Sequence, residues 1–237
     1  MRPGVKTEEK IMPENTDFER VNSEIDKRVK AGVEYRMTAA MEARADEKEG
    51  RKIVRGYATT FGEEYLLYDF GDYKVYESID RHAFDGCDMS DVIMQYDHQG
   101  RVFARNRNKT LTLQTDDHGL LIEADLSGTE LGGQLYEEIR GGYTDKMSMA
   151  FKVAEDKREV VEDHENNVIT VHRTITKFAK LFDVSAVSYP ANDGTEISAR
   201  SFSSGIVEEI KKESLEAEKR ARKARSLLLY INMKRED

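Results

Sequence analysis

Short runs in which apolar and polar residues alternate fill the chain from about residue 34 to residue 201. The runs EYRMTAAMEAR, KIVRGYATTFG, YKVYESI and DVIMQYDH have strand length and are separated by charged or glycine-containing breaks. Residues 110–116 and 120–127 predict a hairpin with a turn near Asp117–Gly119, and residues 151–163 and 168–181 predict a longer one rich in β-branched residues. The run LFDVSAVSYP, which Pro190 can end, closes a region dominated by strands.

Helical periodicity is clear at one place in this region. Apolar residues at i, i+4 and i+8 occur in SGTELGGQLYEEIRGG. They are Leu131, Leu135 and Ile139. Ser127 or Thr129 can cap the start of this helix, and Gly141–Gly142 can end it in the left-handed conformation. A second, short helix is expected within Asp80–Asp85.

Both ends of the chain are charged. Residues 1–33 form an arm with a sparse helical pattern from Asp17 to about Lys30, and residues 204–235 predict a long charged helix with a patchy apolar side. The organisation is therefore an arm at 1–33, a domain at 34–201 and a helical tail at 202–237. The expected fold class is α+β, with a mainly antiparallel sheet or barrel-like core, packed helices and helical extensions at both ends.

Composition narrows the class of protein. Apolar residues make up 38% and charged residues 35%, so part of the chain must be solvated helix or tail rather than core. The net charge of −9 argues against a general nucleic-acid binder. The single Cys87 excludes an intrachain disulfide framework and a multi-cysteine zinc site. No stretch approaches the roughly 18 apolar residues of a membrane span, and the first thirty residues lack the apolar run of a signal peptide, so we expect a soluble intracellular protein.

Two side chains stand out as candidates for chemistry. His98 ends an apolar strand and precedes Gly100, and catalytic side chains tend to lie in loops at such strand ends. Ser148 follows the predicted helix and its two glycines, and it alternates with Met147 and Met149, so its hydroxyl points away from their large apolar side chains. The small Ala150 on the same side is expected to leave room for a substrate.

Asp183 is a third candidate, because a carboxylate inside an apolar strand must be paired. Its partner could be an imidazole N–H or the cation of an arginine or lysine. A serine hydroxyl becomes a nucleophile when a base lies in hydrogen-bond reach and a third group orients that base. The three residue types fit these roles, but only the tertiary structure can bring them together.

Six segments carry a family resemblance by their order and spacing. They are GYATTFG, YESIDRHAF, QYDH, GLLIEADL, KMSMAF and FDVSAVSYPAN. Over about residues 34–200 the chain resembles the tailed-phage prohead proteases, which are similar in fold to the herpesvirus assembly proteases, a β-barrel ringed by helices. The resemblance implies that His98 and Ser148 are catalytic. Asp183 stands where the family commonly has glutamate. Because the herpesvirus relatives use a second histidine, His172 is an alternative third member.

The resemblance also implies a reaction and a setting. Ser148 would attack a peptide carbonyl after His98 takes its proton, with backbone N–H groups of Gln99–Arg105 or of the glycines before Ser148 as candidate oxyanion donors. The substrates would be the scaffolding segment of the major capsid protein and the protease itself, inside the assembling prohead in the bacterial cytoplasm. No cofactor or metal is needed, no nucleic acid or membrane is expected as a partner, a homo-oligomer is possible, and the helical tail would bind scaffold or shell.

Three other functions compete with this one. The charged ends suit a catalytically inactive capsid-assembly or scaffold-binding protein. A cysteine hydrolase could use Cys87 with His82 or His98, although the acids around Cys87 would raise the pKa of its thiol. A carboxylate-based hydrolase would need a pair of acids, and no such pair stands out in the sequence.

Overall fold

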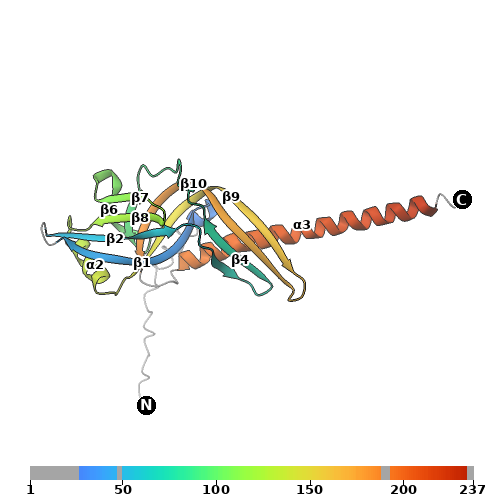
Figure 1. The fold of residues 1–237 in the computed structure, drawn as a ribbon, viewed down its shortest axis with the longest axis horizontal. Coiled ribbons are helices and arrows are strands. Elements are labelled where there is room, and N and C mark those ends of the chain that lie inside the picture. The colour runs from blue at the N-terminus through green and yellow to red at the C-terminus, as the bar shows by residue number, and fades with distance from the viewer. Residues whose placement is uncertain (1–26, 47–49, 188–192, 234–237) are drawn as a thin grey trace, which may run out of the picture.

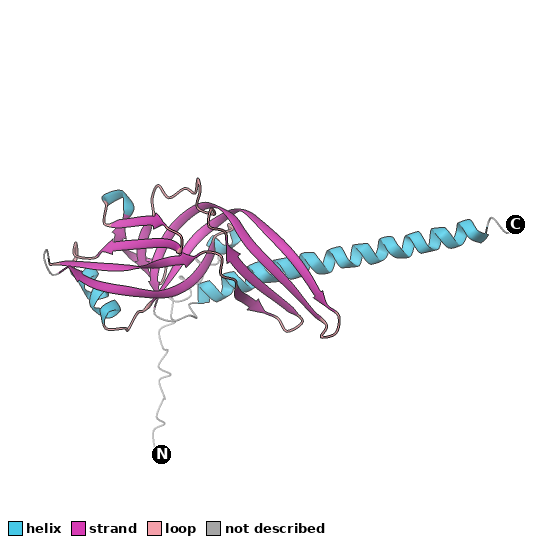
Figure 2. Ribbon diagram, in the orientation of Figure 1, coloured by secondary structure: helices cyan, strands magenta, loops and turns pink. Residues whose placement is uncertain are grey.

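The computed structural model describes residues 27–46, 50–187 and 193–233. Strands dominate it, and helices lie at its periphery (Figure 2). The elements in chain order are β1 (Glu34–Asp46), β2 (Arg51–Thr60), β3 (Tyr65–Asp69), β4 (Tyr73–Ile79), β5 (Ile93–Tyr96), β6 (Gln99–Arg105), the 3-10 turn η1 (Asn106–Asn108), β7 (Leu111–Thr115), β8 (Gly119–Asp125), α2 (Glu130–Arg140), β9 (Lys146–Asp163), β10 (Val168–Val187) and α3 (Asp193–Met233).

The strands form one open sheet in the order β3-β4-β10-β9-β1-β2-β8-β7. One edge of β10 pairs with β9 along its length, whereas the other edge pairs first with β4 and then with β5, which itself pairs with β6. Among the described strands, β3 and β7 end the order and do not pair with each other. The predicted barrel is therefore wrong. The strands β3 and β4 and the outer parts of β9 and β10 form an extension that leads away from the other strands instead of closing on them (Figure 1).

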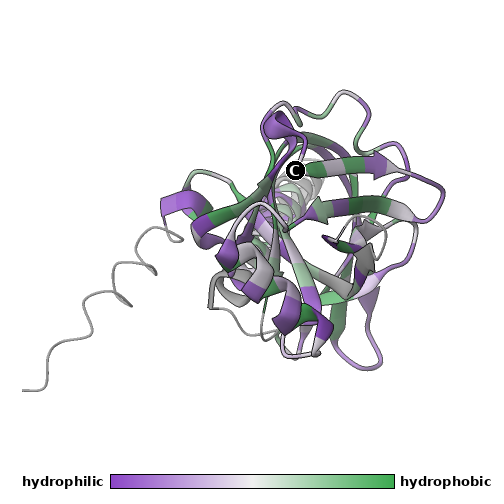
Figure 3. Cartoon of the chain, turned by 90° about the vertical axis from the view of Figure 1, so that its left-hand side faces the viewer, coloured by the Kyte–Doolittle hydropathy of each residue, from purple (hydrophilic) through white to green (hydrophobic). Residues whose placement is uncertain are grey.

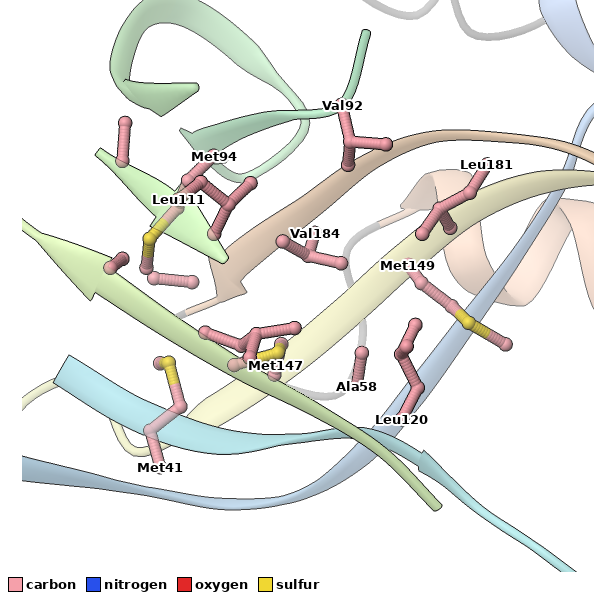
Figure 4. Packing of buried hydrophobic residues seen from close by; sticks show 14 of the residues in the cluster. Met41, Ala58, Val92, Met94, Leu111, Leu120, Met147, Met149, Leu181 and Val184 are labelled. Carbon is pink, nitrogen blue, oxygen red and sulfur yellow. The ribbon is translucent and has the colours of Figure 1, made fainter. Parts of the chain in front are cut away.

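The main core lies between the inner parts of β9 and β10 and the strands β2, β5 and β8. Met147 and Met149 of β9 pack there with Leu181 and Val184 of β10 (Figure 4). Apolar residues gather on the strands, and hydrophilic residues colour many of the turns (Figure 3). The inner parts of β9 and β10, where Ser148 lies, are thus backed by a layer of fully buried side chains.

Both predicted hairpins and the predicted helix are present. β7 pairs with β8, and β9 pairs with β10 around a turn at residues 164–167. Thr129 caps α2, its hydroxyl accepting a hydrogen bond from the Gly132 N–H at 2.9 Å. Gly142 follows the helix at a φ of 72°, the left-handed conformation that glycine adopts most easily. Leu135 and Ile139 are buried, whereas Leu131 is 37% exposed, so the apolar face of α2 is narrower than expected.

Two local predictions are wrong, and one strand was not predicted. Asp80–Asp85 forms turns rather than a helix, since the Asp80 carboxylate accepts the His82 N–H at 2.8 Å and so favours a turn. The segment Gln99–Arg105, expected to be a loop, is strand β6, paired with β5. Strand β3, which the pattern did not indicate, pairs with β4 through half-exposed side chains whose alternation is weak.

A buried group of charged side chains joins the extension of β3, β4 and the outer parts of β9 and β10 to the rest of the sheet. Arg36 of β1 donates to both oxygens of Glu77 on β4, at 2.6 and 2.9 Å. Arg173 of β10 donates to Glu77, Glu34 and Asp156 at 2.6 to 3.0 Å. We call these five residues the buried ion network. Because every charge in it has an opposite partner, the network can remain ionised at low exposure.

Helix α3 begins on the sheet and then leaves it (Figure 1). Ala199, Ser203 and Ile206 are buried, and the Phe202 ring lies 3.8 Å from the Arg173 guanidinium carbon. From residue 211 to residue 225 every side chain is exposed. No described helix is long and apolar enough to cross a membrane. The helix predicted from Asp17 to Lys30 lies mostly outside the described residues, of which 27–30 are helical.

Candidate active site

His98, which was predicted to end a strand, lies in the tight turn between β5 and β6, two residues beyond the end of β5 at Tyr96. Tyr96 pairs with Gln99, so Asp97 and His98 form a two-residue hairpin loop, with φ values of 50° and 59°. Both residues thus have the positive φ of type I′ turns, which few residues other than glycine and asparagine adopt without cost. The Asp97 N–H donates to the Ala186 carbonyl at 2.9 Å, and this bond ties the turn to β10.

Ser148 is the third residue of β9 and lies in the middle of the sheet. Its backbone is in register with Met37 of β1 and with Ser185 of β10. As expected, its hydroxyl lies on the face opposite to the core methionines. Ala150 does not leave an open space, however, because Val33 and Tyr35 pack over it.

The three candidates come together in one chain of hydrogen bonds. The His98 Nε2 lies 2.6 Å from the Ser148 Oγ, and the His98 Nδ1 lies 2.5 Å from the Asp183 Oδ1. Asp183, as a carboxylate, can only accept, so it fixes the tautomer in which Nδ1 carries the proton and Nε2 accepts from the serine. This is the arrangement that a nucleophilic serine requires.

The three side chains lie beneath the surface. Ser148, Asp183 and His98 are 0%, 1% and 6% exposed. In this low-dielectric setting, the interaction of a carboxylate with an imidazolium is stronger than it would be in water.

Tyr35 and Ser185 also contact this chain of hydrogen bonds, although we did not single them out from the sequence. The Tyr35 ring meets the His98 ring edge to face, with centroids 4.8 Å apart. Burial raises the pKa of Tyr35, against the opposite effect of the nearby Arg28. The Ser185 hydroxyl donates to the Asp183 Oδ1 at 2.8 Å. Period-two alternation was the available signal for Ser185, since it places residues 183 and 185 on one face.

His172 does not join this site. It lies on the outer part of β10, where its Nδ1 is 2.7 Å from the Glu64 Oε1 and its ring stacks on Tyr76. Asp183, and not His172, therefore contacts the His98 ring.

Cys87 is poorly placed for the rival chemistry. Burial and, to a smaller extent, the charge of Asp88 raise the pKa of its thiol to about 11, against smaller opposing effects of a backbone hydrogen bond and Lys180. The thiolate is therefore scarce at neutral pH. His82 is exposed and faces Asp85 at 3.2 Å, and both nitrogens of His98 are engaged by Ser148 and Asp183. In the described part of the chain, no group of three or more potential ligands could hold a metal ion.

The two glycine N–H groups suggested as oxyanion donors have other partners. The Gly141 N–H donates to the Glu137 carbonyl at 2.9 Å, and the Gly142 N–H donates to the Ile139 carbonyl at 3.0 Å. These bonds complete the end of α2. The two glycines therefore shape the turn before β9 and do not point free N–H groups at Ser148.

A cavity of about 330 Å³ opens beside the carboxylate of Asp183. Val33, Ile93 and Phe182 give it apolar walls. Its charged lining residues are Arg28, Asp91, Arg105 and Asp183, of which Arg105 is ion-paired with Asp91.

Comparison with known proteins gives a clear family assignment. The description "Caudovirus prohead serine protease" matches over residues 39–212, most of the chain. The chain belongs to this family. The matched range includes His98, Ser148 and Asp183, the three residues joined by the chain of hydrogen bonds.

Two further comparisons add little to this family assignment. No curated protein matches the sequence. Among solved structures, the chain is similar to the bacteriophage T4 capsid assembly protease, gp21, with 10% identity, a TM-score of 0.33, and coverage of 65% of this chain and 98% of that one. A likeness at that score carries no argument about the site, which stands on the geometry given above.

Proposed function

We propose that this prohead protease is a serine endopeptidase in which Ser148 is the nucleophile, His98 the general base and Asp183 the group that orients His98. The observation that carries the proposal is the position of the His98 ring, whose two nitrogens lie 2.6 Å from the serine oxygen and 2.5 Å from the carboxylate. Side chains 50 and 85 residues apart in the sequence meet there almost fully shielded from solvent.

The reaction follows from these contacts. His98 Nε2 takes the Ser148 proton as the Oγ bonds to the peptide carbonyl carbon, and Asp183 stabilises the resulting imidazolium. The carbon–nitrogen bond breaks when His98 returns the proton to the leaving amine. Water then attacks the acyl carbon and loses a proton to His98. The bond from the acyl carbon to the Ser148 Oγ breaks as His98 passes this proton to the Oγ, and the carboxylic acid leaves.

Burial of the serine implies that substrate binding includes a rearrangement. Ser148 is 0% exposed, and Tyr35 and Val33 pack on the same face of the sheet. A peptide carbonyl must come within about 3.5 Å of the Oγ for attack, so side chains over the site must move as a substrate enters. Closure around the substrate would then keep water away during acylation.

The proposed substrates are the scaffolding segment of the major capsid protein and the protease itself, cut inside the assembling prohead in the bacterial cytoplasm. The family assignment supports this setting. The exposed length of α3 from residue 211 onward supports a second role, in which the tail binds scaffold or shell. We expect neither nucleic acid nor membrane as a partner, and a homo-oligomer stays a possible form.

The experiment is co-expression of the chain with its cognate capsid protein, read by intact mass. Defined cuts by the wild type that Ser148→Ala abolishes would support the proposal and give the cleavage sites. Cys87→Ser is the matched control and should cut normally. Equal cutting by the wild type and Ser148→Ala would contradict the nucleophile. Capsid binding without cutting by any form would favour an inactive scaffold-binding protein.

A further inference from the structure

Ser185 is a buried hydroxyl beside the proposed site that the mechanism above does not use. It lies on β10 in register with Ser148 on β9, so the two serines are direct neighbours across the strand pair. It is 0% exposed. Its hydroxyl donates at 2.8 Å to the Asp183 Oδ1, the same oxygen that lies 2.5 Å from the His98 Nδ1.

We propose that Ser185 is a positioning residue that sets the direction and the charge of the Asp183 carboxylate, and through it the orientation of His98. This inference rests on the proposed function. A short aspartate side chain has two torsions, and the bond from the adjacent hydroxyl on the same strand fixes both. Asp183 can then present Oδ1 to the imidazole without a search among rotamers.

The hydrogen bond from Ser185 also lowers the negative charge that the Asp183 carboxylate presents to His98. Ser185 and His98 share one oxygen, so each donor takes part of its negative charge. Without the Ser185 hydroxyl, the carboxylate would hold the imidazolium of His98 more tightly. The imidazolium would then be stabilised relative to the neutral ring, which is the form that accepts the proton of Ser148.

Neighbouring groups do not replace Ser185 in this role. Gln95 of β5 is in register with Ser185, but its amide nitrogen donates to the Gly100 carbonyl at 3.3 Å. That bond spans the turn that carries His98. In the described part of the chain, the side-chain hydrogen bonds to Asp183 come from His98 and Ser185.

The test uses the full-length chain and a fluorogenic peptide that spans a cleavage site found by intact mass. For Ser185→Ala we expect kcat to fall about tenfold, the effect of losing one hydrogen bond to a charged group. KM should stay unchanged, and the acid limb of the kcat/KM profile should move to higher pH. Ser203→Ala is the matched control, because Ser203 is equally buried on α3 and its hydroxyl has no hydrogen-bond partner among the described residues.

The outcomes separate the two proposals. Cleavage by the wild type with an unchanged kcat and pH profile in Ser185→Ala would overturn the positioning role and leave the protease standing. A fall in kcat without the shift of the acid limb would also overturn it, since that result indicates only local loosening. Absence of cleavage by the wild type would remove both. If Ser185→Ala does not fold, Ser185→Cys keeps the volume with a weaker donor and should show a smaller loss in the same direction.

Discussion

The inner and outer halves of β9 and β10 are built from the same two strands but are stabilised in different ways. In the inner half, Met147–Phe151 faces Leu181–Val187 and nearly every side chain is buried on both sides of the sheet. In the outer half, β9 is almost entirely exposed from Glu155 to Asp163, and only alternate residues of β10 are buried. Register shifts between Ile175 and Asp183 mark the change from one half to the other.

This difference shows how the side chains of the candidate site are held in position. The inner half holds Ser148 and Asp183 by close packing, which leaves little freedom for side chains that must meet within hydrogen-bond distance. The outer half has only a small apolar cluster, formed by Val75, Val171 and Ile206, and it also contains the buried ion network with Phe202 of α3 against it. The two halves meet at β1, where Arg36 enters the network and Tyr35 contacts the His98 ring.

The largest effect is expected from Asp183→Asn, which tests the inner half. Asparagine keeps the size but favours the wrong tautomer of His98, so kcat should fall by about 10⁴-fold. Initial rates of peptide cleavage measure this. Urea unfolding should show a far smaller change in the free energy of unfolding than that in the activation free energy. A variant with near-normal kcat would contradict the role of Asp183.

A second prediction concerns the outer half, through Glu77→Gln. The change leaves Arg36 and Arg173 short of one buried negative charge, so the free energy of unfolding should fall by about 3–5 kcal/mol at pH 7. Urea unfolding followed by circular dichroism measures it. Glu209→Gln, which loses only the exposed ion pair with Arg158, is the control and should cost well under 1 kcal/mol.

The same carboxylate gives a pH dependence. Burial alone would raise the pKa of Glu77, but Arg36 and Arg173 outweigh it and lower the pKa to about 2, from an ordinary 4.5. Its contribution is therefore complete above about pH 4.5 and is lost as pH falls toward 2. The difference in stability between the wild type and Glu77→Gln should shrink over that range. A constant difference from pH 7 to pH 2 would contradict the assignment.

The smallest effect is expected from Thr129→Ala, at the start of α2. The helix loses the hydroxyl that accepts the Gly132 N–H, which should cost about 1 kcal/mol of unfolding free energy. Thr129→Ser keeps the hydroxyl and is the matched control. Cleavage activity should be unchanged in both variants, because the Thr129 hydroxyl bonds to Gly132 within α2 and not to Ser148 or Asp183. A loss as large as that of Glu77→Gln would place α2 in the same cooperative unit as the network.

Much of the local structure could be predicted from the pattern of residues. The long hairpin of β9 and β10, the hairpin of β7 and β8, and the extent of α2 follow from alternation, β-branched residues and helix-end signals, which act between close neighbours in the chain. The candidates His98, Ser148 and Asp183 were also visible, as polar residues in places where polar residues are costly or exceptional. Strand β3 was missed, because its alternation is too weak to show.

The sequence by itself determined which segments become strands, which residue types could perform the chemistry, and the family to which their order points. Only the tertiary structure decided that the sheet stays open, that His98 lies in a turn tied to β10, and that Ser185 and Tyr35 contact the candidate catalytic residues. The physical reason is range. Alternation and capping are local, whereas the contacts between residues 98, 148 and 183 depend on strand order and register, which many distant pairings fix together.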